Sequence, residues 1–174
     1  MAYEIEKKYL IDSVPDRNFI PHSGAVRYQV STFYTGVIPG KFECRFRKVV
    51  DEDGETRYFT TIKVGGGEQR IEIENEIEEH EYQLAMMVLG IDPKMVIFKD
   101  YVKYLNVGNT GLNLEISTVD NKFSYAEIEF DGMRELRDFE KSSRGILLGL
   151  DNPQDITNLF SMSIYWLQKL QNGI

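Results

Sequence analysis

The chain has 174 residues, 42% of them hydrophobic and 28% charged, which is typical of one globular domain with its own core. Its formal net charge of −8 argues against a nucleic-acid surface, because such surfaces are normally basic. The single cysteine, Cys44, excludes a disulfide within the chain and fits a reducing compartment. Because no apolar run approaches the ~20 residues that cross a bilayer and no secretory signal opens the chain, we expect a cytoplasmic protein without a membrane partner.

Eight segments alternate apolar and polar side chains and are rich in aromatic and β-branched residues, which is typical of strands. Turn residues separate most of them, as at Pro39-Gly40 and Asp53-Gly54. Short connections of this kind predict mainly antiparallel pairing. In chain order the predicted strands are 3–11, 26–34, 41–49, 57–64, 69–77, 96–105, 111–118 and 124–131.

Three further segments have apolar residues at helical spacing. Residues 78–89 form the first and stop near Gly90, and residues 133–148 form the second. Asp155 is predicted to cap a last helix that is strongly apolar. Since no repeat or linker divides these elements, residues 1–174 are predicted to form a single domain.

The predicted strands separate charged from apolar side chains, because neighbouring side chains in a strand point to opposite faces. In 41–49, for example, Arg45 and Arg47 share one face and Phe42 and Phe46 share the other. The charged faces either meet water around open sheets or turn inward in a closed barrel. Carboxylates dominate the first, seventh and eighth strands and basic residues the third, fourth and sixth, which favours a barrel whose acids and bases meet across a lumen. A metal ion and a polyanion would then compensate the enclosed charges.

The first strand carries the most informative pattern. Glu4, Glu6 and Lys8 project from one face, while Ile5 and Tyr9 point the other way. Such a triplet suits a divalent metal carrying a phosphate, because carboxylates hold the ion and the ammonium meets the anion. The same pattern also fits the wet face of an ordinary sheet, so it gains weight only from similar strands later in the chain.

Taken in order, these residues resemble the CYTH superfamily, also called triphosphate tunnel metalloenzymes. The resemblance spans roughly residues 1–131, and the ordered set is more specific than any one element. The matching residues are Glu4, Glu6 and Lys8; Arg45 and Arg47; Lys63 in a Thr-Ile-Lys context; Arg70 with Glu72 and Glu74; and Glu127 with Glu129.

The resemblance implies an α+β, mainly antiparallel fold: an eight-stranded closed tunnel with a polar lumen and about three outer helices. It implies Mg²⁺ or Mn²⁺ as the cofactor, which suits hard oxygen ligands. The implied metal ligands are Glu4, Glu6, Glu115, Glu127 and Glu129, and the implied substrate-binding residues are Lys8, Arg45, Arg47, Lys63, Arg70, Lys99 and Lys103. Among these, the residues expected to act in catalysis are Glu4, Glu6, Lys8 and Glu129.

Two positions depart from the family pattern. Members often carry a Lys-x-Arg pair on the sixth strand, but here Tyr101 stands between Lys99 and Lys103. On the seventh strand, Ser117 follows Glu115 where a second acid is frequent. These departures weaken the prediction of a complete metal and phosphate site.

The resemblance favours hydrolysis of a small-molecule triphosphate, either inorganic tripolyphosphate or an organic triphosphate. Three alternatives stay open: a class IV adenylyl cyclase, a non-catalytic polyphosphate-binding module, and a β-rich domain whose charges face solvent. The apolar terminal helix is expected to pack on the barrel, and a homodimer contact through it also stays open.

Overall fold

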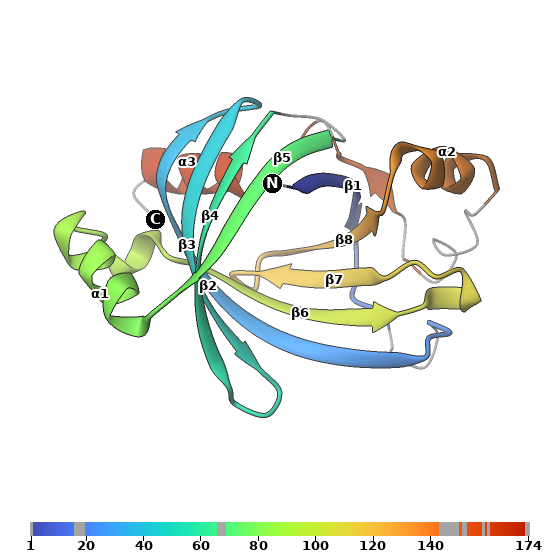
Figure 1. Cartoon of the computed structure of the whole chain (residues 1–174), viewed down its shortest axis with the longest axis horizontal. Helices are drawn as coiled ribbons and strands as arrows, with labels where there is room; N and C mark the ends of the chain where they lie inside the picture. Colours follow the sequence, from blue (N-terminus) through green and yellow to red (C-terminus); the bar gives the residue numbers. More distant parts are fainter. Residues whose placement is uncertain are drawn as a thin grey trace.

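The computed structural model of the chain describes residues 2–15, 20–65, 69–142, 150, 153–157, 159 and 161–172. Eight antiparallel strands follow one another around a closed barrel in the order β5-β4-β3-β2-β6-β7-β8-β1, and the pairing of β5 with β1 completes the circle (Figure 1). The predicted tunnel fold is therefore confirmed. The strands are β1 (Ala2–Ile11), β2 (Gly24–Ile38), β3 (Phe42–Asp51), β4 (Thr56–Val64), β5 (Gln69–Ile77), β6 (Ile97–Leu105), β7 (Leu114–Val119) and β8 (Phe123–Phe130).

Two strand boundaries differ from the prediction for local reasons. The β2 strand continues to Ile38 because a bulge between Tyr34 and Gly36 shifts the register and lets pairing with β3 resume. The β7 strand begins only at Leu114. Before it, Gly111 has a φ of +83°, a left-handed conformation that belongs to a turn and not to a strand.

Two helices flank the barrel on opposite sides in Figure 1: α1 (Glu79–Val88) and α2 (Met133–Ser142). Glu78 and Glu81 form a capping box at the start of α1, with the Glu78 amide donating to the Glu81 carboxylate at 2.8 Å. The remainder of the predicted 133–148 helix, residues 143–148, lies outside the described residues. A short 3-10 turn, η2 (Pro93–Met95), precedes β6, and another, η3 (Val107–Asn109), follows it.

The prediction that Asp155 caps the last helix is wrong. Asp155 lies in the short strand β9 (Gln154–Asp155), which pairs with β1 opposite Tyr9. Its carboxylate accepts hydrogen bonds from the backbone N–H of Thr157 at 3.0 Å and from the Thr157 hydroxyl at 2.6 Å. The last helix, α3 (Met162–Asn172), begins later, where the Ser161 Oγ accepts from the Ile164 N–H at 3.2 Å. Asp155 therefore pairs in the sheet, although the local pattern assigned it to a helix cap.

The apolar outer faces of the strands pack against α1 and α2, as predicted. Around α2, Leu136 and Phe139 join a cluster with Ile5 and Ile128. Around α1, Tyr82 packs with Phe33 and Tyr58. Among the described residues, no helix combines the length and the apolar character that a membrane span requires.

The third helix does not lie on the outer wall as expected. Its Tyr165 and Trp166 pack against Tyr34, Ile97, Val119 and Tyr125. Register shows that these four point into the lumen, since Tyr34 pairs with Arg45 and Tyr125 pairs with Ser117. Helix α3 therefore covers inward-facing side chains at one end of the barrel.

Candidate functional site

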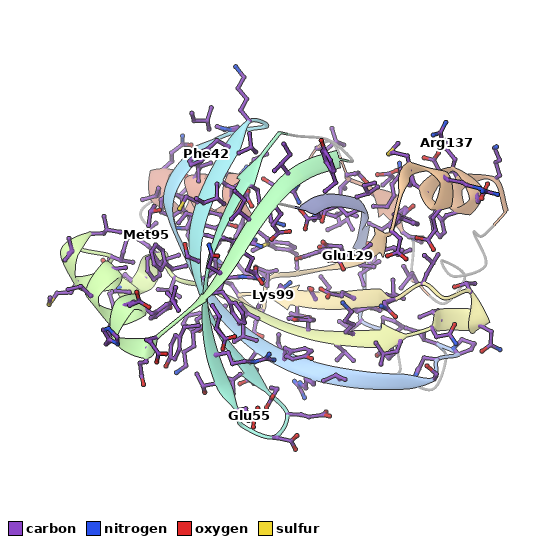
Figure 2. All side chains as sticks on the ribbon, viewed as in Figure 1. Phe42, Glu55, Met95, Lys99, Glu129 and Arg137 are labelled. Carbon is purple, nitrogen blue, oxygen red and sulfur yellow. The ribbon has the colours of Figure 1, made fainter. Side chains whose placement is uncertain are left out.

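The charged faces of the strands converge on one cavity of about 750 Å³ inside the barrel. Glu4, Arg45, Lys63 and Glu129 all line it, although they come from four different strands. Figure 2 shows Glu129 among the side chains inside the barrel and Glu55 on a hairpin tip at its periphery. The predicted inward orientation of the ionic faces is therefore confirmed.

Most of the residues that the sequence singled out line this cavity. They are Glu4, Lys8, Arg45, Arg47, Lys63, Arg70, Lys99, Glu115, Glu127 and Glu129. Glu6 instead borders a smaller adjoining cavity of about 80 Å³, together with Lys63 and Arg70. Lys103 reaches the same region through ion pairs, with its Nζ 3.5 Å from Glu115 and 3.8 Å from Glu129.

Three carboxylates form the compact acidic group of the site. One oxygen from each of Glu4, Glu127 and Glu129 lies within 4.8 Å of the others. Strands β1 and β8 bring them together, because the two strands pair antiparallel with Lys8 opposite Glu127 and Glu6 opposite Glu129. Three convergent carboxylates without a nitrogen or sulfur ligand suit a hard divalent cation such as Mg²⁺ or Mn²⁺.

The other two predicted metal ligands lie outside this group. Glu6 is 3% exposed and forms ion pairs with Lys8 and Arg70. Glu115 lies between two lysines of β6, 3.5 Å from the Lys103 Nζ and 3.9 Å from the Lys99 Nζ. Their nearest charged partners are thus basic side chains.

A dense set of basic side chains surrounds the acidic group on β1, β3, β4 and β5. Lys63 contacts Glu4 and lies 3.4 Å from Glu72, and Arg70 lies 3.0 Å from Glu4. Similar pairs join Lys8 to Glu127 at 3.4 Å, Arg45 to Glu43 at 3.8 Å, and Arg47 to Glu74. The bases thus alternate with acids and do not form one uniformly positive patch.

These arginines still offer donors to an anion. The Nε atoms of Arg45, Arg47 and Arg70 are buried, and none has a hydrogen-bond partner among the described residues. Buried donors without partners are costly unless something satisfies them. Guanidinium groups match phosphate oxygens well, so a phosphate-bearing ligand suits these positions.

Proton affinities differ sharply between the two carboxylates of β8. Burial alone would raise the pKa of Glu127, but nearby Lys8 lowers that pKa to about 2. Burial and the charges of Glu115 and Glu127 raise the pKa of Glu129 to about 7. Glu127 is therefore fully ionised at neutral pH. Glu129 is only partly ionised there, and a bound cation would displace its proton.

Lys8 remains charged in spite of its burial. Desolvation would lower its pKa, but Glu127 and Glu6 raise it above the ordinary value. In Lys63, by contrast, burial and the nearby Arg45 outweigh the attraction of Glu4 and lower the pKa. The lumen is thus a coupled set of charges in which each group depends on its neighbours.

Several lumen residues were not predicted as part of the site. Glu43, Glu72 and Glu74 line the cavity as partners of the basic side chains. Their even spacing, two or four residues from a predicted site residue on the same strand, was the available signal. Thr32 and Tyr125 also line the cavity, but nothing in their local sequence separates them from core residues.

No family model matches the sequence, and no curated protein matches it. Solved structures do. The PH1819 protein from Pyrococcus horikoshii OT3 aligns with a TM-score of 0.68 at 20% identity, covering 95% of this chain and 99% of that one. The inorganic triphosphatase NE1496 aligns with a TM-score of 0.52 at 18% identity, covering 91% and 89%.

A third neighbour is the Hippeastrum protein HpAC1, an adenylyl cyclase candidate whose description reports a dominant triphosphatase activity. It aligns with a TM-score of 0.56 at 12% identity, covering 97% of this chain and 96% of that one. At such low identities the likeness concerns the fold. The chain thus has the closed tunnel fold that its resemblance to the CYTH superfamily implied, and it shares that fold with an inorganic triphosphatase.

Proposed function

We propose that this chain is a divalent-metal-dependent hydrolase of triphosphates, acting on inorganic tripolyphosphate or an organic triphosphate inside the tunnel. The observation that carries the proposal is the convergence of two chemistries on one cavity. One oxygen from each of Glu4, Glu127 and Glu129 lies within 4.8 Å of the others, and Arg45 and Arg70 line the same cavity with Nε donors that have no hydrogen-bond partner in the described part of the chain.

In this proposal Glu4, Glu127 and Glu129 hold Mg²⁺ or Mn²⁺. A cation held there would supply Lewis-acid chemistry toward the phosphate groups. Arg45, Arg47 and Arg70 donate to the non-bridging oxygens, and Lys8 and Lys63 contribute point charges. These groups stabilise charge that develops on the leaving phosphate, so positioning and electrostatics supply most of the rate enhancement.

Glu129 is the residue best suited to act on water. Its side chain is 51% exposed at the cavity, so water reaches the carboxylate, which a cation held beside it would keep ionised. Glu127 is less suited, because a carboxylate with a pKa of about 2 accepts a proton poorly.

The direct test is a substrate panel on the full chain. Tripolyphosphate and ATP are incubated with Mg²⁺, Mn²⁺ or a chelator, and phosphate, ADP and cyclic AMP are measured. We expect phosphate release only with a divalent cation. Cyclic AMP as the main product would instead establish the cyclase, and tight binding without turnover under any cation would establish a binding module.

A Glu4→Gln variant sharpens this test, because it keeps the size of the side chain and removes one of the three converging charges. We expect turnover to fall by about 100-fold or more, since the site loses a cation ligand. Glu55→Gln is the matched control, because Glu55 is exposed and far from the lumen at a hairpin tip (Figure 2). Near-normal activity of Glu4→Gln at saturating Mg²⁺ would refute the assignment.

A further inference from the structure

One transverse row of the lumen is uncharged. Tyr28 pairs with Tyr101, Tyr101 with Ser117, and Ser117 with Tyr125, so that four side chains on β2, β6, β7 and β8 form a continuous line. All four carry a hydroxyl group, and we name them the hydroxyl row. This row contains both positions at which the sequence departs from the family pattern.

The row next to it has the opposite character. Two residues further along β6, β7 and β8, Lys103 pairs with Glu115 and Glu115 with Glu127. Glu127 in turn pairs with Lys8 on β1. Directly paired residues share a face, so both rows face the lumen. The hydroxyl row is therefore a neutral strip beside an ionic one.

The accessible end of the hydroxyl row lies at Tyr28 and Tyr101. Their rings stack with centroids 5.0 Å apart at an angle of 25°, and both side chains are partly exposed. The Lys99 Nζ lies 4.3 Å from the Tyr101 ring centroid, which fixes the ring from its own strand. Tyr101 lines the large cavity.

The closed end lies at Ser117 and Tyr125, which are 0% and 2% exposed. The Ser117 Oγ has no hydrogen-bond partner among the described residues. Burial raises the pKa of the Tyr101 and Tyr125 hydroxyls above the ordinary value, so both remain protonated donors at neutral pH. The row thus presents neutral donors and acceptors together with aromatic surface.

Such a row cannot compensate phosphate charge. The guanidinium groups that can, those of Arg45, Arg47 and Arg70, come from β3 and β5, and the lysines that line the cavity are Lys8 on β1, Lys63 on β4 and Lys99 on β6. The cavity of about 750 Å³ would hold roughly 25 water molecules at ~30 Å³ each, so there is room beside a phosphate chain for a second chemical group. Hydroxyl groups and aromatic faces are complementary to a sugar and a ring, as in a nucleoside.

We infer that the hydroxyl row makes this site selective for a nucleoside triphosphate over inorganic tripolyphosphate, with Tyr28 and Tyr101 as specificity-determining residues. The inference rests on the proposed function for the placement of the phosphates on β3, β4 and β5. In this arrangement the nucleoside lies against β2 and β6 while the phosphates reach the arginines and the acidic group.

The test measures equilibrium binding, so that it does not depend on turnover. The full chain in Mg²⁺ is titrated by calorimetry with two hydrolysis-resistant probes: the β,γ-imido analogue of ATP and inorganic imidotriphosphate. The wild-type chain should bind the nucleotide analogue more tightly. Tyr101→Phe should weaken the nucleotide analogue by about 3- to 10-fold, the usual cost of one hydrogen bond, and leave imidotriphosphate within about 2-fold.

Three further variants complete the design. Tyr28→Phe removes a hydroxyl from the same accessible end and keeps the test valid if Tyr101→Phe folds poorly. Tyr101→Arg adds a cation and should shift the preference toward imidotriphosphate. Tyr82→Phe is the matched control, since Tyr82 lies on α1, where it packs against Phe33 and Tyr58 outside the lumen, and should alter neither affinity.

The outcomes separate this inference from the proposed function. The inference is overturned, and the hydroxyl row is structural, if the wild-type chain prefers imidotriphosphate or binds neither probe. The same holds if the Tyr101 and Tyr28 variants lose affinity for both probes equally. If the nucleotide preference holds and depends on these tyrosines but no phosphate is released in the substrate panel, hydrolysis fails as the function while the selectivity stands.

Discussion

Two walls of the same lumen differ in the side chains that they present. The ionic wall, formed by the lumen side chains of β1, β3, β4 and β5, holds acids and bases in direct contact, as in the pairing of Arg70 with Glu4 at 3.0 Å. The mixed wall, formed by those of β2, β6 and β7, has fewer ion pairs among the described residues, such as Lys103 and Lys99 with Glu115 at 3.5 and 3.9 Å, and includes most of the hydroxyl row. Both walls arise from the same alternating strand pattern.

The difference shows how a barrel can enclose many charges and remain folded. On the ionic wall each buried basic side chain among the described residues has a carboxylate partner, so none of these charges is buried alone. The same pairs place the carboxylates that we propose as cation ligands within a few ångströms of the proposed phosphate donors. On the mixed wall, neutral hydroxyl groups avoid the cost of burying charge, but they also give up attraction for phosphate.

Removing one basic side chain from each wall should give the largest difference in phosphate affinity between the two walls. Arg70→Gln leaves Glu4 and Glu6 without a main partner and removes a phosphate donor, so we expect imidotriphosphate binding in Mg²⁺ to weaken by about 100-fold. Lys99→Gln removes a base whose ion pair is long, and we expect a loss of about 10-fold or less. Calorimetry on both variants checks this order.

Thermal unfolding of the same two proteins is the necessary control, because Arg70→Gln also leaves buried Glu4 and Glu6 with one basic partner fewer, Lys63 and Lys8 remaining. The affinity comparison is valid where both variants remain folded at the titration temperature. Equal losses of affinity in folded Arg70→Gln and Lys99→Gln would show that the two walls contribute alike to phosphate binding.

A smaller effect concerns the protonation of Glu129. Its carboxylate lies near Glu127 on the same strand and 3.8 Å from the Lys103 Nζ of the mixed wall. Its pKa of about 7 lies above the unfolded value near 4.5, so between these values the folded chain holds a proton that the unfolded chain has released. The contribution of this group to the free energy of unfolding is therefore fully present below about pH 4.5 and is lost as pH rises through 7. A bound cation should displace the proton in the same range.

We accordingly expect Mg²⁺ binding to release protons at pH 6.5 and almost none at pH 8. Calorimetry in two buffers of different ionisation enthalpy measures that release. Because the Glu129 side chain is 51% exposed, solvent screens the neighbouring charges and the change should extend over a broad pH range. Proton release at pH 6.5 that persists in Glu129→Gln would assign the titration to another group.

The alternating strand pattern predicted the lumen residues well, because a period of two fixes which side chains share a face. It could not predict which of them become neighbours. Glu4 meets Glu127 only because β1 pairs with β8 from the other end of the barrel sequence, and a local pattern contains no register. A partner distant in the chain also determined the conformation of Asp155. This residue pairs with β1 in a sheet and does not cap a helix as its local sequence predicted.

The terminal helix shows the same limit. Its apolar stripe predicted burial, but hydrophobicity has no direction and does not say which surface receives it. The structure places Tyr165 and Trp166 against lumen-facing residues at one end of the barrel. One polar residue helps to fix this choice. Asp120, just after β7, accepts hydrogen bonds from the Tyr165 hydroxyl and the Lys169 Nζ, both at 2.9 Å.

Asp120→Asn should therefore loosen α3 with little effect on the distant acidic group. Its carboxylate also accepts from the Phe98 N–H at 2.8 Å; although burial would raise its pKa, these hydrogen bonds lower it. We expect the free energy of unfolding to fall by about 1–3 kcal/mol, the usual cost of weakening hydrogen bonds to a charged group, and Tm to fall by roughly 2–4 °C for each kcal/mol.

The matched control is Asp100→Asn, which breaks an ion pair with Arg27 that is half exposed and should cost well under 1 kcal/mol. The stabilisation by Asp120 should be present above pH 4 and lost as pH falls through its lowered pKa, so the difference between wild type and Asp120→Asn should narrow in acid. A constant difference down to pH 2 would mean that Asp120 holds α3 through its shape and not through its charge.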